Sequence, residues 1–362
     1  MIYIGAPFMG GPFPYLSADP MIDATPVDGN AYGIPAGLVR KALRIYLPRS
    51  YEALNSSYDV IGLDDATCAN FDSRILAWFR EGVIESGLGL FMAGGFESFG
   101  GMAGFPSWGP TPVGDVLPVD PTGAYPNGVR IKITDPDDPL IRTLPFETFG
   151  DEYNFFDANT AEDKEGARVI ARLEWYNYPA WAWWDIGTGR TYASCTPFRG
   201  GGVGPFSQWL YYGDFVSNVV YFTAGIGLPQ DIELVHIARE RMLRVIDERS
   251  YVISILDFIE RFGANSEKAL EKVGEAEEKR AHAVSLFRDL RMADSISGLD
   301  DALENLDQAY ELAMDARDRA MIWIFMVQWL VVTSTGLLCG FILWTVMVKR
   351  RLYRDVVTTR LG

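Results

Sequence analysis

The chain has 362 residues, and 48% of them are hydrophobic, which is enough apolar material for two or three folding units with cores of their own. Its formal net charge is −16 at pH 7. A protein that binds a phosphate backbone needs a basic face, and this acidic chain offers none. The composition therefore argues against a nucleic-acid partner.

The longest apolar run lies near the end of the chain. Met321 to Val348 contains no charged residue, and Lys349-Arg350-Arg351 follows directly. At a rise of ~1.5 Å per residue, this run is longer than the ~30 Å hydrocarbon core of a bilayer. We therefore predict one tilted transmembrane helix over residues 321–348, with the lipid bilayer as a partner.

The flanking charges predict the orientation of that helix. The tail 349–362 holds five Lys or Arg and one acid, whereas residues 301–320 hold six acids and two arginines. Because Lys and Arg stay preferentially on the cytoplasmic side, we predict a basic cytoplasmic tail and a large extracytoplasmic portion. The opposite arrangement stays open, because Met1–Gly5 is typical of a strand rather than of a signal peptide.

Cysteine and histidine are scarce. Cys339 lies inside the apolar run, and Cys68 and Cys195 could form a disulfide or remain free thiols. The only histidines are His236 and His282, and no C-x-x-C pair occurs, so a structural zinc site lacks ligands. We predict no cofactor and no metal.

The first 230 residues alternate apolar runs with helical patterns and turn residues. Apolar runs predict buried strands at 1–5, 58–63 and 88–93, and helical spacing predicts helices over 36–47 and 73–86. The glycine- and proline-rich segment 7–20 predicts an irregular loop. This alternation favours an α/β domain over residues 1–230, a flavodoxin-like parallel sheet flanked by helices, with ligand sites at the carboxyl ends of its strands.

Residues 231–320 have a different character, with no proline and with apolar residues at helical spacing. We predict an antiparallel helical stalk, with one helix over about 266–292 and a turn at 294–299 before the next. An oligomerising coiled coil is the alternative. The predicted organisation is therefore an α/β domain (1–230), a stalk (231–320), a membrane helix (321–348) and a tail (349–362).

A family resemblance becomes visible at Phe91–Gly104, with the sequence FMAGGFESFGGMAG. Short motifs follow it in order: Thr111-Pro112, Leu117-Pro118-Val119, Asp138-Pro139-Leu140 and Gly187-Thr188-Gly189-Arg190. Together they resemble the glutamine amidotransferase-like proteins, relatives of class I glutamine amidotransferases and of trehalose-utilisation-type domains. The resemblance covers about residues 1–230.

Class I amidotransferases place a cysteine nucleophile on a sharp strand-to-helix turn, where a histidine activates it. The corresponding position here falls near Met92 or Ala93, and no histidine occurs in residues 1–230. Phe198 stands where a histidine after a late strand would be expected. The resemblance therefore implies a domain without the catalytic pair, a pseudoenzyme.

Other side chains remain as candidates for a site. Weak catalytic candidates are Glu97, Ser98 and Cys195, although Ser98 without a nearby base is more often a helix cap. Candidate ligand-binding residues at the predicted strand ends are Asp64, Gly94, Gly95, Glu97 and Ser98. A tryptophan cluster is a candidate interface, formed by Trp181, Trp183 and Trp184, and burial in the core is its alternative.

Two functions follow from these patterns. The first is a membrane-anchored, catalytically inactive domain that serves as a structural or recognition part of a membrane or cell-surface complex, in a homo- or hetero-oligomer. The second is a hydrolase that acts on a carbohydrate or an amide through Asp64, Glu97 or the thiol of Cys195. An open pocket around these side chains would favour the second.

Overall fold

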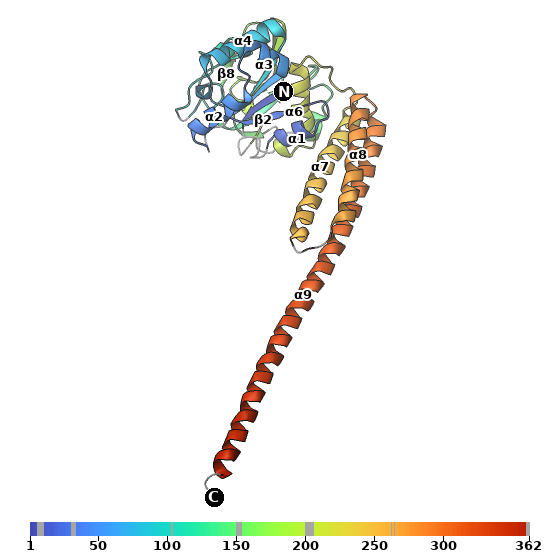
Figure 1. Ribbon diagram of the computed structural model, residues 1–362. Helices are drawn as coiled ribbons and strands as arrows, with labels where there is room; N and C mark the ends of the chain where they lie inside the picture. Colours follow the sequence, from blue (N-terminus) through green and yellow to red (C-terminus); the bar gives the residue numbers. More distant parts are fainter. Residues whose placement is uncertain are drawn as a thin grey trace. The chain divides into compact units, whose positions relative to one another are not determined.

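The computed structural model describes residues 1–5, 11–29, 34–102, 104–149, 154–199, 206–261, 263 and 265–359 (Figure 1). The chain divides into two compact units. The first comprises Met1–Leu243 with Ala283–Ser297, and the second comprises Arg244–His282 with Gly298–Gly362. The division thus falls inside long helices rather than at residue 230. Arg360, one of the basic residues of the tail, lies outside the described residues.

The first unit is built on a nine-stranded sheet of order β2-β1-β3-β4-β11-β10-β9-β6-β7. Parallel pairing joins the first part of this order: β2 (Thr25–Asp28), β1 (Ile2–Gly5), β3 (Val60–Asp64), β4 (Gly89–Gly94) and β11 (Gly189–Pro197). Antiparallel pairing adds the rest: β10 (Pro179–Ile186), β9 (Arg168–Leu173), β6 (Asn127–Ile133) and β7 (Asn154–Asp157). A small antiparallel pair stands apart: β5 (Val119–Pro121) and β8 (Ala161–Asp163).

The α/β class is therefore confirmed, but a flavodoxin-like fold is not. The difference arises at the hairpin between β10 and β11, where Gly187 adopts φ 62° and lets the chain reverse tightly. The strands from β2 to β11 in the sheet order pair in parallel, and those from β11 to β7 pair antiparallel.

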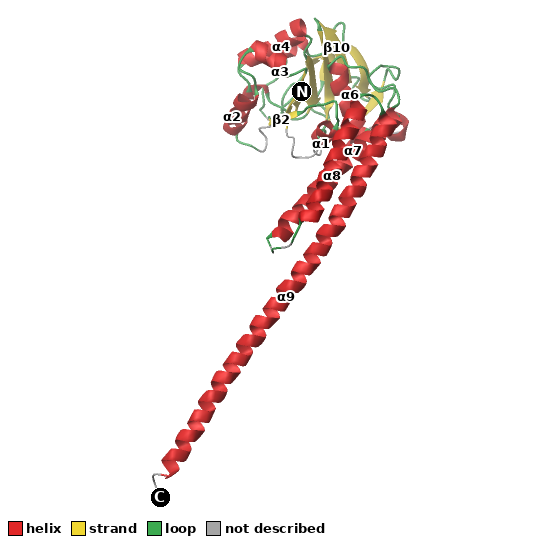
Figure 2. Ribbon diagram, turned by 45° about the vertical axis from the view of Figure 1, so that its right-hand side comes forward, coloured by secondary structure: helices red, strands yellow, loops and turns green. Residues whose placement is uncertain are grey.

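Helices cover both faces of the sheet (Figure 2). They are α1 (Phe13–Ala18), α2 (Ala36–Tyr46), α3 (Tyr51–Ser57), α4 (Ser73–Ser86), α5 (Pro112–Val116) and α6 (Tyr212–Thr223), with short 3-10 turns at Cys68–Asn70 and Phe146–Phe149. Successive strand residues point to opposite faces, so Phe91 of β4 joins one core and Met92 joins the other. The core that contains Phe91 packs against α6, and the core that contains Met92 packs against α2 and α4.

One predicted loop contains a helix. The segment 7–20 was expected to be irregular, yet residues 13–18 form α1, with Pro14 in the first turn, where a missing N–H costs nothing. Residues 6–10 lie outside the described residues. The buried side chains of Leu16 and Ala18 hold α1 against the domain.

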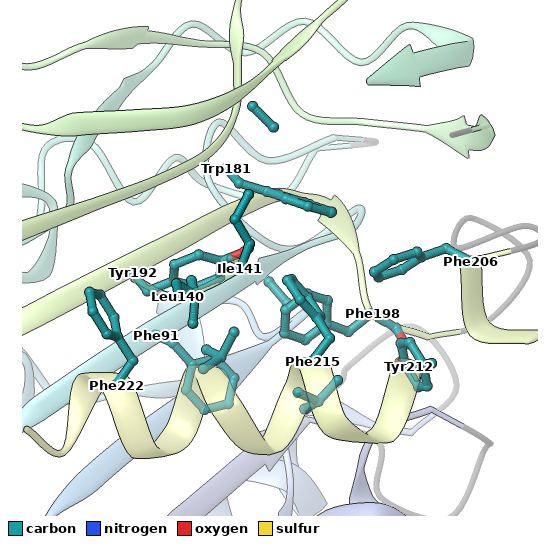
Figure 3. Close-up of a cluster of buried hydrophobic side chains, with 14 of the residues drawn as sticks. Phe91, Leu140, Ile141, Trp181, Tyr192, Phe198, Phe206, Tyr212, Phe215 and Phe222 are labelled. Carbon is teal, nitrogen blue, oxygen red and sulfur yellow. The ribbon is translucent and has the colours of Figure 1, made fainter. Parts of the chain in front are cut away.

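The aromatic core between the sheet and α6 is the largest packing feature of the first unit (Figure 3). Trp181 is 0% exposed, its ring lies 4.8 Å from that of Phe215, and its indole N–H donates to Thr196 Oγ1 at 3.0 Å. Trp183 is also buried and donates to Asp138. The predicted interface role of Trp181 and Trp183 is therefore wrong, because both side chains are used inside the domain; Trp184 is half-buried.

Three long helices follow: α7 (Ile232–Glu260), α8 (Glu267–Arg288) and α9 (Met292–Thr359). In the second unit, Arg249 forms an ion pair with Glu277, and the rings of Tyr251 and Tyr310 stack at 5.9 Å. The turn between α8 and α9 comes earlier than predicted. Leu290 adopts a positive φ of 61° and Arg291 N–H donates back to Leu286 O, so the helix ends before Met292 and restarts there.

The last part of α9 is long and apolar enough to cross a membrane. Its side chains have no cover among the described residues; Trp329, for example, is 72% exposed. Exposed apolar surface of this extent is unfavourable in water. The structure therefore contains one candidate membrane helix where the sequence predicts one.

Replacing Trp181 by alanine tests the aromatic core. Removing a fully buried indole leaves a cavity and removes the hydrogen bond from the indole to Thr196, so we expect the free energy of unfolding to fall by about 3 to 5 kcal/mol. Trp175→Ala is the matched control, because Trp175 is 62% exposed, and it should change stability by less than about 0.5 kcal/mol. Denaturation of the detergent-purified chain, followed by near-UV circular dichroism, measures both. Equal losses in the two variants would contradict this account of the core.

Candidate functional site

Charged side chains gather where the parallel strands end. β3 ends at Asp64, Asp65 follows it with a positive φ of 48°, and Arg199 follows β11. Parallel strands bring their carboxyl ends to one edge of a sheet, which is where α/β domains bind ligands. This edge is therefore the first candidate for a functional site.

Arg199 connects the two neighbouring aspartates. Its Nη2 lies 3.0 Å from Asp65 Oδ2, and its Nε lies 3.6 Å from Asp64 Oδ2. The hydroxyl of Tyr3, on β1, donates to the same Asp64 oxygen. Burial raises the pKa of Asp64 to about 6, although the Arg199 charge and the Tyr3 hydrogen bond act in the opposite direction.

A second polar group lies at the beginning of β6 and the end of β7. The Tyr125 hydroxyl donates to Asp157 Oδ1 at 2.7 Å, and the ring of Phe96 packs edge-on against Tyr125 at 5.3 Å. Burial raises the pKa of Asp157, and the charge of Asp65 raises it further. Tyr125, Asp157 and Phe96 are all half-buried, so solvent reaches part of this group.

The end of β4 is closely packed. A Cβ at Gly94 would overlap the carbonyl oxygen of Cys195, and a Cβ at Gly95, which has φ 151°, would overlap the carboxyl group of Asp65. The side-chain amide of Asn159 holds this turn in place. Its Oδ1 accepts a hydrogen bond from Gly95 N–H at 2.9 Å, and its Nδ2 donates one to Gly95 O at 3.0 Å. Neither glycine position has room for a side chain. The two residues before them, Met92 and Ala93, are fully buried.

The predicted ligand-binding residues come together at this turn, but their side chains are enclosed. Asp64, Glu97 and Ser98 are fully buried, the Ser98 hydroxyl donates to Ala93 O at 2.7 Å, and the Glu97 N–H donates to Asp65 at 2.7 Å. Ser98 therefore supports the turn and has no base beside it that the structure describes.

Cys195 is not an accessible thiol. It is fully buried in the core that contains Met92, and burial raises its pKa well above the usual range. Cys68 and Cys195 are both free, so the disulfide alternative is wrong. A neutral, enclosed thiol is a poor nucleophile, so its burial weighs against the predicted catalytic role of Cys195.

Sequence reasoning missed Tyr3, Tyr125, Asp157, Asn159 and Arg199. Arg199 had a usable signal, because it directly follows Phe198 at the end of a late strand. Tyr125 and Asp157 had none, because they meet only through the antiparallel register that places Asn127 opposite Asp157. Among the described residues, no group of three or more His, Cys, Asp or Glu side chains could hold a metal ion.

Residues 48–224 match the family model described as "Putative glutamine amidotransferase" (GATase1_like). A search of curated proteins finds no match for the chain.

Solved structures similar to the chain include two described as cytoplasmic proteins of Salmonella typhimurium. STM3548 is 22% identical with a TM-score of 0.48, and STM1381 is 24% identical with a TM-score of 0.47; each match covers 59% of this chain and 87% of the other. A β-galactosidase from Bacillus circulans sp. alkalophilus is 13% identical over 59% of this chain and 27% of its own, with a TM-score of 0.33. The family resemblance is thus confirmed by the family model over residues 48–224 of this chain.

Proposed function

We propose that this protein is a membrane-anchored member of the family that does not hydrolyse glutamine and that serves as a structural or recognition part of a membrane complex. The observation that carries the proposal is the closed turn after β4. The family's nucleophile is expected near Met92 or Ala93, which are both fully buried, and the two glycines that follow them, Gly94 and Gly95, have no room for a side chain.

The general base has no equivalent either. Residues 1–230 contain no histidine. Phe198 is buried in the aromatic core, and Arg199, the next residue, is engaged with Asp64 and Asp65. A guanidinium stays protonated at physiological pH, so Arg199 cannot accept a proton from a nucleophile. An arginine held between two carboxylates supports a rigid polar surface better than it supports catalysis.

That surface has the features of a recognition site. Asp65, Arg199 and Asp157 are partly accessible, and they present carboxylates and a guanidinium beside the rings of Phe96 and Tyr125. Their positions are fixed by neighbouring strand ends, which keeps the entropy cost of binding low. A polar partner would meet this edge of the sheet with little rearrangement.

The membrane helix supports the anchoring part of the proposal. The exposed apolar side chains of α9 favour a bilayer around residues 321–348, and the basic tail favours the cytoplasm for the end of the chain. In this arrangement residues 1–320 are extracytoplasmic. The same helix is the surface through which we expect the protein to form homo- or hetero-oligomers, since Trp181 and Trp183 are buried.

Catalytic inactivity is tested with purified full-length protein. We expect no ammonia from glutamine and no hydrolysis of nitrophenyl glycosides above the buffer rate, because the family's nucleophile and base are both missing. A class I amidotransferase and a glycosidase serve as positive controls for the two assays. Ammonia release that Cys195→Ala abolishes, or glycoside hydrolysis that Asp64→Asn abolishes, would show that the domain is an enzyme.

Orientation is tested by protease protection in sealed vesicles. In right-side-out vesicles, added protease should digest residues 1–320 and spare a tag placed after Gly362, because the positive charges retain the tail inside. Inside-out vesicles are the matched control and should give the opposite result. Protection of the large portion in right-side-out vesicles would mean that the body is cytosolic.

Assembly is tested by measuring mass in mild detergent. We expect the full chain to form a stable oligomer or to co-purify with a partner, and we expect a chain that ends at Ala320 to lose that association while the first unit stays folded on its own core. Circular dichroism checks the folding of the shortened chain. A full chain that remains a single copy at all concentrations, with no partner, would contradict the proposed role in a complex.

A further inference from the structure

A cavity of about 340 Å³ lies among α1, α6, the beginning of α7 and the segment 206–211. It shares no lining residue with the strand-end site. Its lining includes Tyr15, Trp209, Asp214, Ser217, His236 and Arg239. All of these residues belong to the first unit, and the volume is at the lower end of the range found for sites that bind small molecules.

A buried network of charges forms one side of this cavity. Arg239 is only 8% exposed; its Nε donates to Asp19 Oδ2 at 2.7 Å, and its Nη1 donates to Asp214 Oδ1 at 2.8 Å. The Tyr221 hydroxyl donates to Asp19 Oδ1 at 2.6 Å. These bonds leave the guanidinium group little freedom to turn.

His236 completes the network. Its Nδ1 lies 2.6 Å from Asp214 Oδ2, and its ring packs against that of Tyr211 with 4.5 Å between the centroids and an angle of 38° between the planes. A carboxylate at Nδ1 holds the imidazole in one orientation and leaves Nε2 for a further partner. No hydrogen bond of Nε2 is found in the part of the chain that the structure describes.

Two more polar atoms of the lining residues lack a partner. Arg239 Nη2 and Ser217 Oγ are buried, and neither has a hydrogen bond to any described residue. A buried polar group without a partner is unfavourable, and native proteins keep few of them. Arg239 therefore has an N–H group at Nη2 that could donate a hydrogen bond to an oxygen atom of a ligand in the cavity.

We propose that this cavity binds a small monocarboxylic acid with an apolar body. A guanidinium fork suits a carboxylate, and an imidazolium at His236 would add a second donor through Nε2. Tyr15, Trp209, Leu210 and Leu243 provide apolar surface for the body of the ligand. Glu240, exposed at the same cavity, disfavours a second negative charge.

The charge balance explains why the acid needs His236. Asp19 and Asp214 carry two negative charges against the one positive charge of Arg239, so the network has a net charge of −1 when the imidazole is neutral and is neutral when the imidazole is protonated. A carboxylate therefore meets no net repulsion from this network only when His236 carries a proton. The other charged or titratable groups in the network, in the lining or against the His236 ring are Tyr15 on α1, Tyr211, Tyr221 on α6 and Glu240 on α7. None of these adds a positive charge. A neutral amide of the same shape lacks the charge that pairs with His236 and should bind more weakly.

The test titrates phenylacetate and its neutral analogue phenylacetamide into the detergent-purified full chain by calorimetry, with empty micelles as a blank. We expect phenylacetate to bind at least about tenfold more tightly than the amide. His236→Ala should weaken phenylacetate binding by about tenfold or more, whereas His282→Ala, which removes the histidine of α8 outside the cavity, should leave it unchanged.

Arg239→Lys provides a second variant, because lysine keeps the positive charge but lacks the fork. We expect it to weaken phenylacetate binding as well, and thermal unfolding of each variant checks that it is folded. Absence of phenylacetate binding to the original chain would overturn the proposal without the need for any variant. Equal binding of acid and amide, or equal losses in His236→Ala and His282→Ala, would also overturn it.

Discussion

The pairing of β4 with β11 is the contact on which the rest of the first unit depends. In this parallel pair Leu90 lies opposite Thr191 and Ala93 lies opposite Ser194, although 101 residues separate each pair in the sequence. β11 also begins the antiparallel half of the sheet through its hairpin with β10. The same strand therefore brings Tyr192 into the aromatic core, closes the turn after β4 with the Cys195 carbonyl, and leads into Arg199 beside Asp64 and Asp65.

The same pairing also shapes the turn on which the proposed inactivity rests. A nucleophile at the end of β4 needs an open turn so that its side chain can project above the sheet. Here the irregular register between Ser194 and Pro197 places the Cys195 carbonyl against Gly94, and Asp65 lies against Gly95. Restoring a cysteine at this turn would require both neighbours to move, and Asp65 is held by Arg199 and by the Glu97 N–H. The proposed inactivity therefore rests on the packing of this turn as well as on the missing residues.

The sequence predicted the parts of the structure that local patterns control. Apolar runs identified β3 and β4, because a buried strand needs consecutive apolar residues. Apolar residues at helical spacing identified α4, and Gly87 identified its end, because a positive φ there favours glycine. Two strands of the antiparallel half, β6 and β9, left weaker traces, since exposed and half-buried residues interrupt their buried ones. The roles of Trp181 and Arg199 could not be predicted, because each depends on partners that are distant in sequence: Phe215 lies on α6, and Asp64 precedes Arg199 by more than a hundred residues.

Arg199 and Arg239 have similar partners but different surroundings. Arg199 pairs with Asp64 and Asp65, and Arg239 pairs with Asp19 and Asp214, so each guanidinium lies between two carboxylates. Removing either arginine would leave buried negative charges unpaired, which typically costs about 3 to 5 kcal/mol.

The surroundings of the two arginines differ. Arg199 supports a turn that has no room for a side chain, whereas Arg239 and the oriented imidazole of His236 border a cavity of about 340 Å³. In this protein the capacity to hold a small ligand has its strongest physical support at the helices α1, α6 and α7, away from the strand ends where the family carries out its chemistry.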